Sequence, residues 1–293
     1  MHPRLFSTLV LIDPVIQRMP SMRGNAGPAK ASTMRRDRWP SRNAAAASYK
    51  RSKFYQTWDQ RVLDKWIEYG LRDTPTYIHP HANSSATPPV ITADPSTATA
   101  PPEKNTEVEI TLSTTKHQEV FTFMRPNYPT EDGKLDPYTH PDVDPAATPN
   151  TPFYRPESLA VFHRLPHLRP SVLYVFGDLS DMSAPLFRAD KMAMTGVGVG
   201  GSGGLKAGRV REITFQGVGH LIPMEVVDKT ADECAGWIVP EIERWRSQEE
   251  KMRAEWARVP RKEKGKMSEL YVKTMTGNWA DEVNSRPAKT SKL

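Results

Sequence analysis

One histidine in the chain has a setting that suits acid–base chemistry. His220 stands in Gly217-Val-Gly-His, shortly after the alternating stretch 210–215. Glycine at 217 and 219 permits backbone dihedrals that other residues avoid, so the loop could project the imidazole outward. An ordinary turn histidine is the alternative reading of the same residues. The pattern therefore predicts a general base, or else a turn, at this position.

Three aspartates could partner this imidazole. Asp181 lies in FGDLSDMSAP, four residues past Gly177, while Asp178 and Asp13 each stand directly at the end of an apolar stretch. A carboxylate that accepts a hydrogen bond from an imidazole fixes its tautomer and stabilises its charged form. Aspartate in such loops is often only a turn or helix-capping residue. Asp181 is the first choice, and Asp13 and Asp178 remain open.

The elements that would position these side chains are typical of an α/β protein. Residues 8–12 (TLVLI) and 172–176 (VLYVF) are short apolar runs that indicate strands buried on both faces of a parallel sheet, and 210–215 alternates as an edge strand would. Helical patterns follow the second and third strands at 183–194 and 231–246. Active sites of open α/β sheets lie at the carboxyl edge, where these polar residues would meet.

A long insertion separates the first two strands. About 160 residues lie between Asp13 and Val172, far more than one crossover needs. The insertion begins with a helical pattern over 44–72, in which Asp59 is the expected N-cap and Gly70 the expected left-handed end. A Pro-, Ser- and Thr-rich stretch over 79–105 cannot supply a core and is expected to be a mobile loop. This arrangement predicts a mainly helical cap.

Charge and composition narrow the classes of function. The 293 residues carry a net charge of +6, but residues 18–53 contribute +9 and residues 244–266 contribute +5, so the rest of the chain sums to −8. None of the helix-turn-helix, zinc-finger or RNA-recognition signatures is present, so no nucleic-acid partner is expected. The basic stretch 244–266 most simply extends the last helix, and binding to a membrane surface is an alternative.

Cysteine content and the last residues bear on cofactors and location. A single cysteine, Cys234, excludes an intramolecular disulfide framework and a cysteine-based zinc cluster, and we expect neither metal nor cofactor. No apolar run approaches the roughly 18 residues of a membrane span, which favours a soluble, intracellular protein. Ser291, Lys292 and Leu293 form a peroxisomal import signal, to be read by an import receptor, so we expect the peroxisomal matrix.

Several stretches resemble a known family in their individual residues as well as in their pattern of residue types. They are HPRLFSTLVLIDPVI, RRDRWPSR, SKFYQTWDQRVLDKWIEYGLRD, TTKHQEVFTFMRPNYP, LRPSVLYVFGDLSD and GVGHLIPME. Together they resemble the fungal peroxisomal α/β-hydrolases of the toxin-biosynthesis and peroxisomal-lipase type, from residue 1 to about residue 247.

The resemblance implies a partial α/β-hydrolase fold with parallel strands six to eight and a large, mainly helical cap inserted after strand six. Residues 1–14 and 160–247 would then form the core, 15–159 the cap, and 248–293 a basic helix extension and polar tail. It also implies that His220 is the catalytic histidine, that Asp181 is the usual acid and that Asp13 is the alternative acid. Within the cap, Trp39, Trp58, His117 and Phe121 could line an acyl pocket, although cap core is the more ordinary role.

The family's nucleophile has no counterpart in this sequence. An α/β-hydrolase presents it on a strand–elbow–helix turn ahead of the acid and the histidine. Gly200-Gly-Ser202-Gly-Gly204 matches G-x-S-x-G, but a helix pattern precedes it, a strand follows it, and it comes after Asp181. Ser202 is therefore expected to be a chance match in a glycine-rich loop.

Two functions remain open at this stage. The first is an ester or thioester (acyl) hydrolase of secondary or lipid metabolism that acts on a small-molecule acyl substrate. Because the nucleophile half is missing, this polypeptide alone is expected to be inactive. The second is a non-catalytic peroxisomal binding or assembly protein derived from a hydrolase.

Overall fold

The computed structural model describes residues 5–18, 22–80, 108–126, 153–155 and 157–277. The chain divides into two compact units, residues 1–238 and 239–293, and each is described by itself. The predicted mobile loop over 79–105 falls almost wholly outside the described residues, as does the import signal at 291–293.

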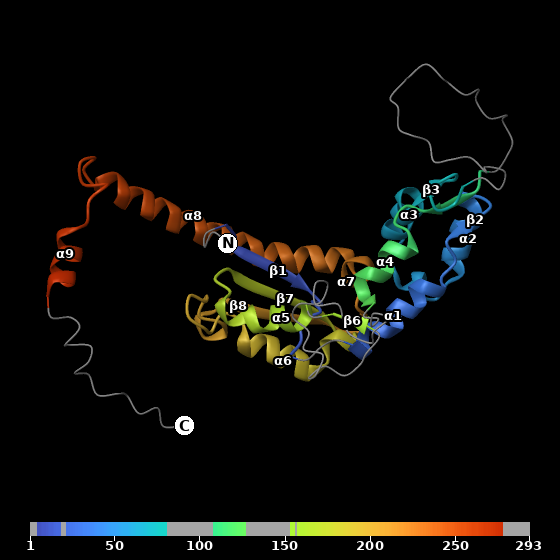
Figure 1. The fold of residues 1–293 in the computed structure, drawn as a ribbon, viewed down its shortest axis with the longest axis horizontal. Helices are drawn as coiled ribbons and strands as arrows, with labels where there is room; N and C mark the ends of the chain where they lie inside the picture. Colours follow the sequence, from blue (N-terminus) through green and yellow to red (C-terminus); the bar gives the residue numbers. More distant parts are fainter. Residues whose placement is uncertain (1–4, 19–21, 81–107, 127–152, 156, 278–293) are drawn as a thin grey trace, which may run out of the picture. The chain divides into compact units, whose positions relative to one another are not determined.

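Three parallel strands form the sheet that the sequence predicts. They are β1 (Thr8–Ile12), β7 (Ser171–Gly177) and β8 (Val210–Phe215), hydrogen-bonded in the order β1-β7-β8 (Figure 1). Leu9 is paired with Val172, and Val172 with Val210, so the three strands run in register toward one carboxyl edge. The prediction that 210–215 is an edge strand is confirmed.

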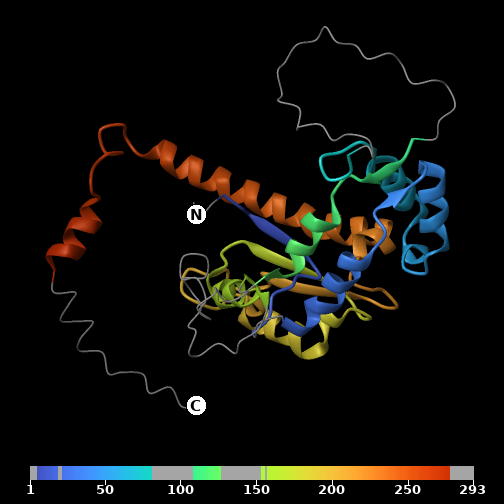
Figure 2. The ribbon, with the colours of Figure 1, turned by 45° about the vertical axis from the view of Figure 1, so that its right-hand side comes forward.

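The central strand β7 is buried along its whole length because helices cover both of its faces (Figure 2). Val172, Tyr174 and Phe176 pack against Met192 of α6 (Pro185–Met194). On the other face, Leu173 and Val175 pack with Ile222 of α7 (Ile222–Glu225) and Trp237 of α8 (Val227–Arg258). A strand that is buried on both faces does not alternate between apolar and polar residues, so residues 172–176 (VLYVF) form a continuous apolar run.

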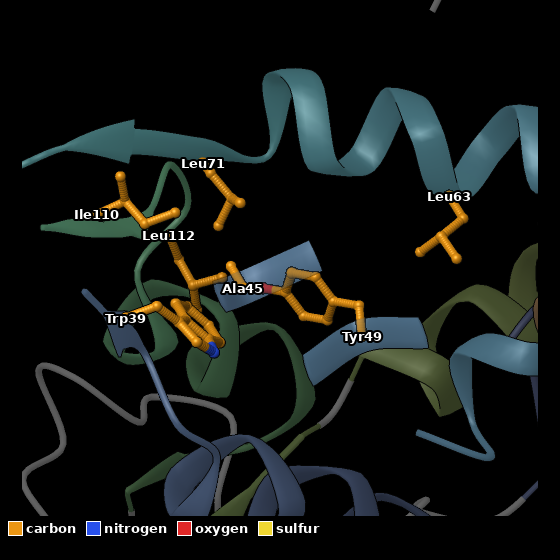
Figure 3. Close-up of a cluster of buried hydrophobic side chains, with 7 residues drawn as sticks. All are labelled: Trp39, Ala45, Tyr49, Leu63, Leu71, Ile110 and Leu112. Atoms are coloured by element: carbon orange, nitrogen blue, oxygen red, sulfur yellow. The ribbon is translucent and has the colours of Figure 1, made fainter. Parts of the chain in front are cut away.

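The inserted region contains a second, antiparallel sheet that the sequence did not predict. It joins β2 (Arg38–Trp39), β4 (Ile110–Leu112) and β3 (Leu71–Asp73) in the order β2-β4-β3. Helices α2 (Arg42–Arg51) and α3 (Gln60–Tyr69) pack on it. The shared core of this region is shown in Figure 3 and consists of Trp39, Ala45, Tyr49, Leu63, Leu71, Ile110 and Leu112.

The helical prediction over 44–72 is right in kind and wrong in detail. The stretch holds α2, a short 3₁₀ turn η1 (Tyr55–Thr57), α3 and the start of β3. Asp59 caps α3 as predicted, since its side chain accepts from the Arg61 N–H. Gly70 has φ −75°, so the predicted left-handed helix end is wrong. The chain passes from helix to strand there without a reversal that would need positive φ.

Short elements complete the first unit. They are α1 (Met22–Met34), α4 (Lys116–Phe123), β5 (Arg125–Pro126), β6 (Phe153–Tyr154), α5 (Glu157–Arg164), and the 3₁₀ turns η2 (Leu165–His167), η3 (Asp181–Ser183) and η4 (Leu205–Ala207). With α1 to α4 among them, the inserted region is mainly helical, as expected.

Among its described residues, the second unit contains the later part of α8 and the helix α9 (Glu269–Thr276), which the sequence did not predict. The helix α8 continues to Arg258, so residues 244–258 of the basic stretch lie in this helix, whereas residues 259–266 lie beyond its end. Trp245, Met252 and Trp256 lie exposed along it. Of the helices described, none is both long and apolar enough to cross a bilayer.

Candidate active site

Asp13 directly follows β1 and is held in an unusual backbone conformation. Its φ is +39°, and its N–H donates to the Val175 carbonyl oxygen on β7 at 2.8 Å. A non-glycine residue with positive φ costs of order 1–3 kcal/mol and persists where the surrounding structure enforces it. The turn places the carboxylate inside the protein, where its side chain has no exposed surface.

His220 lies on a loop beyond β8 that two carboxylates hold by its backbone. Gly217 has φ +72°, which turns the chain after the strand. Asp178 Oδ1 then accepts from the Val218 N–H at 3.2 Å, and Glu225 Oε2 accepts from the Gly219 N–H at 3.0 Å. The backbone just before the imidazole is therefore held by hydrogen bonds to the carboxylates of Asp178 and Glu225.

The end of β7 approaches this loop closely. A Cβ atom built on Gly177 would lie well inside van der Waals contact with the carbonyl oxygens of Val218 and Gly219. Any side chain at position 177 would push the loop away from the sheet. Gly177 is thus required for the close approach that brings His220 to the carboxyl edge.

The structure pairs His220 with Asp13. The imidazole Nδ1 lies 2.6 Å from Asp13 Oδ2, and the Ser180 hydroxyl donates to the same oxygen at 2.5 Å. Because a carboxylate can only accept, we assign the proton to Nδ1. The His220 side chain is 49% exposed, and its Nε2 has no hydrogen-bond partner among the described residues. The ring can therefore exchange a proton with a bound molecule through Nε2 while Asp13 orients it and stabilises its cation.

The first-choice acid lies elsewhere. Asp181 is exposed at the start of η3, and the carboxylate that meets the imidazole is that of Asp13. Asp178, the third candidate, accepts a hydrogen bond from the Val218 N–H. Asp181 and Asp13 both follow strand ends, but only the positive-φ turn at Asp13 directs a carboxylate inward.

Ser202 lies near the opposite edge of the sheet. Its N–H donates to the Leu168 carbonyl oxygen, just ahead of β7, and its loop leads into the start of β8. His220 follows the end of β8, whose six residues span about 20 Å. This placement agrees with the expectation that the G-x-S-x-G match arises by chance.

The four cap residues suggested for a pocket have different surroundings. Trp39 is 3% exposed within the cap core, and Trp58 packs edge-on against Tyr55 and Trp66. His117 and Phe121 are exposed on α4. Phe121 borders a cavity of about 280 Å³, also lined by residues 122–125, Arg155 and Glu157, which does not include the Asp13–His220 pair.

One point of the inserted region does contact the segment after His220. The Asp59 N–H donates to the Met224 carbonyl oxygen at 2.7 Å, and Arg61 pairs with Asp228 at 3.0 Å. The exposed ion pair contributes little stability, but the backbone bond ties the start of α3 to α7. Of the four suggested pocket residues, Trp58 directly precedes the residue that makes this backbone bond.

Sequence reasoning missed three residues of this region. Ser180 has no sequence signal beyond its position in a polar loop, and Glu225 stands five residues after His220 in an ordinary helix start. The third, Lys191, is fully buried in α6. A lysine within the pattern of an amphipathic helix gives no warning of burial. Within the described ranges, no group of three or more His, Cys, Asp or Glu side chains could hold a metal ion.

Comparison with known proteins shows which fungal proteins the chain resembles. No family model matches the chain. The chain is 33% identical to the type I acyl-CoA thioesterase mpaH of Penicillium roqueforti, in a match covering 100% of this chain and 64% of that protein. It is 24% identical to the abhydrolase domain-containing protein AFT2-1 of Alternaria alternata, over 80% of this chain and 74% of that one. The chain is therefore similar in sequence to fungal α/β-hydrolases.

Two further facts describe the extent of this likeness. The chain spans 64% of the length of the Penicillium roqueforti thioesterase and 56% of that of the Penicillium brevicompactum thioesterase mpaH', which is less than two thirds of either. Among solved structures, the peroxisomal α/β-hydrolase Lpx1 of Saccharomyces cerevisiae aligns with a TM-score of 0.48 at 10% identity, over 97% of this chain and 56% of that one.

Replacing Gly177 by alanine should displace the His220 loop. The added methyl group meets two backbone oxygens that cannot rotate away, so we expect a loss of about 1–3 kcal/mol in the free energy of unfolding. Amide NMR signals of residues 218–220 should move as well. Gly236→Ala is the matched control, because open space surrounds that helical position and alanine favours helix. Equal, small effects of both substitutions would contradict the close approach.

Proposed function

We propose that this chain carries the acid–base half of a fungal thioester hydrolase that acts on acyl-CoA-type substrates. The observation that carries the proposal is the Asp13–His220 pair at the carboxyl edge of the sheet, with Nδ1 held at 2.6 Å and the ring half exposed. The likeness to type I acyl-CoA thioesterases supports the thioester as the bond that is cleaved.

In this mechanism His220 moves the protons. Its Nε2 takes the proton from a hydroxyl nucleophile as that oxygen attacks the thioester carbonyl, and the cation so formed is stabilised by Asp13. The imidazolium then donates the proton to the departing thiolate as the carbon–sulfur bond breaks. A water molecule, deprotonated by the same imidazole, then attacks the acyl–enzyme ester. As the ester carbon–oxygen bond breaks, the imidazolium returns the proton to the nucleophile oxygen, which restores the hydroxyl and releases the carboxylic acid.

We assign neither the nucleophile nor the oxyanion-hole donors to residues of this chain. No strand–serine–helix elbow occurs among the described residues, and Ser202 lies near the far edge of the sheet. We therefore propose that hydrolysis requires sequence beyond these 293 residues, as the greater length of the relatives suggests. The paired and oriented histidine favours a hydrolase over a purely structural binding protein, because a scaffold has no need of it.

The test is an acyl-CoA hydrolysis assay on the longest protein encoded at the locus, with release of free thiol as the readout. That protein should hydrolyse acyl-CoA, and His220→Ala should lower kcat by about 10³-fold or more. His163→Ala, at an exposed histidine on α5, should leave kcat unchanged. Full activity of His220→Ala, or a locus without an upstream strand and elbow serine, would contradict the proposal.

We propose the peroxisomal matrix as the location, on the basis of Ser291-Lys292-Leu293 at the end of the sequence. A fluorescent protein fused ahead of residue 1 should accumulate in peroxisomes of a fungal host. Removing residues 291–293 should disperse the fluorescence through the cytosol, whereas Lys289→Ala, just upstream of the tripeptide, should not. Peroxisomal fluorescence that survives the deletion would show that the tripeptide is not the signal.

A further inference from the structure

A buried lysine lies next to the acid–base pair and has no role in the mechanism described so far. Lys191 of α6 is 0% exposed. Its Nζ makes only long hydrogen bonds, at 3.5 Å to the Met182 carbonyl oxygen and 3.4 Å to that of Phe187, and it lies 5.7 Å from the centre of the Phe176 ring. These neutral groups solvate an ammonium but do not neutralise its charge.

Asp13 is incompletely paired in the same region. Its Oδ2 receives both hydrogen bonds, while Oδ1 is buried without a partner among the described residues. Within the described part of residues 1–238, Asp13 and Lys191 are the charged side chains that are buried. A buried charge is tolerated when an opposite charge is close. Asp13 and Lys191 carry opposite charges, so each could compensate the charge of the other.

The η3 turn connects the two residues through a short series of hydrogen bonds. Ser180 Oγ donates to Asp13 and accepts from the Met182 N–H at 3.2 Å, and the Met182 carbonyl oxygen accepts from Lys191. Asp13 therefore contacts Ser180, the N-cap residue of η3, and Lys191 contacts Met182 within η3, in the segment that follows β7. The turn fixes both charges relative to His220.

The other charged groups around Lys191 are already engaged or face solvent. Asp190 pairs with Arg18 at 2.6 Å on the surface, and Asp181 is exposed. Burial lowers the pKa of Lys191 to about 8, and the carboxylates of Asp13 and Asp190 act against that lowering. The ammonium is thus mostly charged at neutral pH and loses its proton in a range where no ordinary lysine does.

We propose that Lys191 is the buried counter-ion of Asp13 and thereby sets the pH at which His220 takes up its proton. This proposal rests on the role of the Asp13–His220 pair described above, and it makes Lys191 a positioning residue for charge. Its cation supplies the opposite charge near the buried Asp13 carboxylate. It also offsets part of the attraction that Asp13 exerts on a proton at His220.

The experiment is an NMR titration of the histidine ring signals in the 293-residue chain. Lys191→Met has similar volume and no charge, so we expect the midpoint of the His220 titration to rise by at least about 0.5 on the pH scale. Lys191→Arg keeps the charge and should keep the midpoint. Lys206→Met removes the same charge from an exposed site in η4, ahead of β8, and should have no effect.

A His220 midpoint that is unchanged or lowered in Lys191→Met would overturn the proposal, since a lysine that only fills space leaves the midpoint where it is. If Lys191→Met does not fold, the unmodified chain supplies the test. Its His220 signals should show a second step near pH 8, absent from Lys191→Arg, and absence of that step from both proteins would refute the proposal. Neither measurement needs hydrolysis, so failure of the proposed function remains distinguishable.

Discussion

The burial of one carboxylate organises the site. Asp13 can carry a charge inside the protein only if other groups satisfy it, and two segments supply hydrogen bonds: the Ser180 hydroxyl after β7 and the His220 imidazole after β8. In our proposal the buried Lys191 ammonium on α6 adds the opposite charge. The contact with His220 joins residues 207 positions apart and needs β1, β7 and β8 in register. Loss of that register would leave an unpaired charge in the interior, which is far more costly than the loss of a surface ion pair.

Much of the core could be predicted from local patterns. Residues 172–176 are apolar without alternation because helices cover both faces of β7, and His220 stands out because glycines surround it directly after a strand pattern. The cap was harder to predict. Strands of two or three residues such as β2, β3 and β4 are too short for any periodicity, and they become a sheet only through pairing between distant segments.

The sequence alone does not decide whether Asp13 or Asp181 pairs with His220. Asp13 and Asp181 both follow strands, and spacing along the chain cannot tell which side chain turns inward. That depends on the backbone at each position: Asp13 adopts φ +39° and is buried, whereas Asp181 begins a 3₁₀ turn and faces solvent. The burial of Lys191 could not be predicted for the same reason. Whether a lysine is buried depends on which residues pack over its helix, and the helix sequence does not specify those residues.

The central claim is that Asp13, and not Asp181, holds the proton on Nδ1 of His220. The most direct measurement is the ¹H NMR signal of that Nδ1 proton, which lies far downfield when the proton is held in a short hydrogen bond to a carboxylate. We predict that the signal is present in the unmodified chain, lost in Asp13→Asn and retained in Asp181→Asn. A signal that survives in Asp13→Asn and disappears in Asp181→Asn would contradict the account.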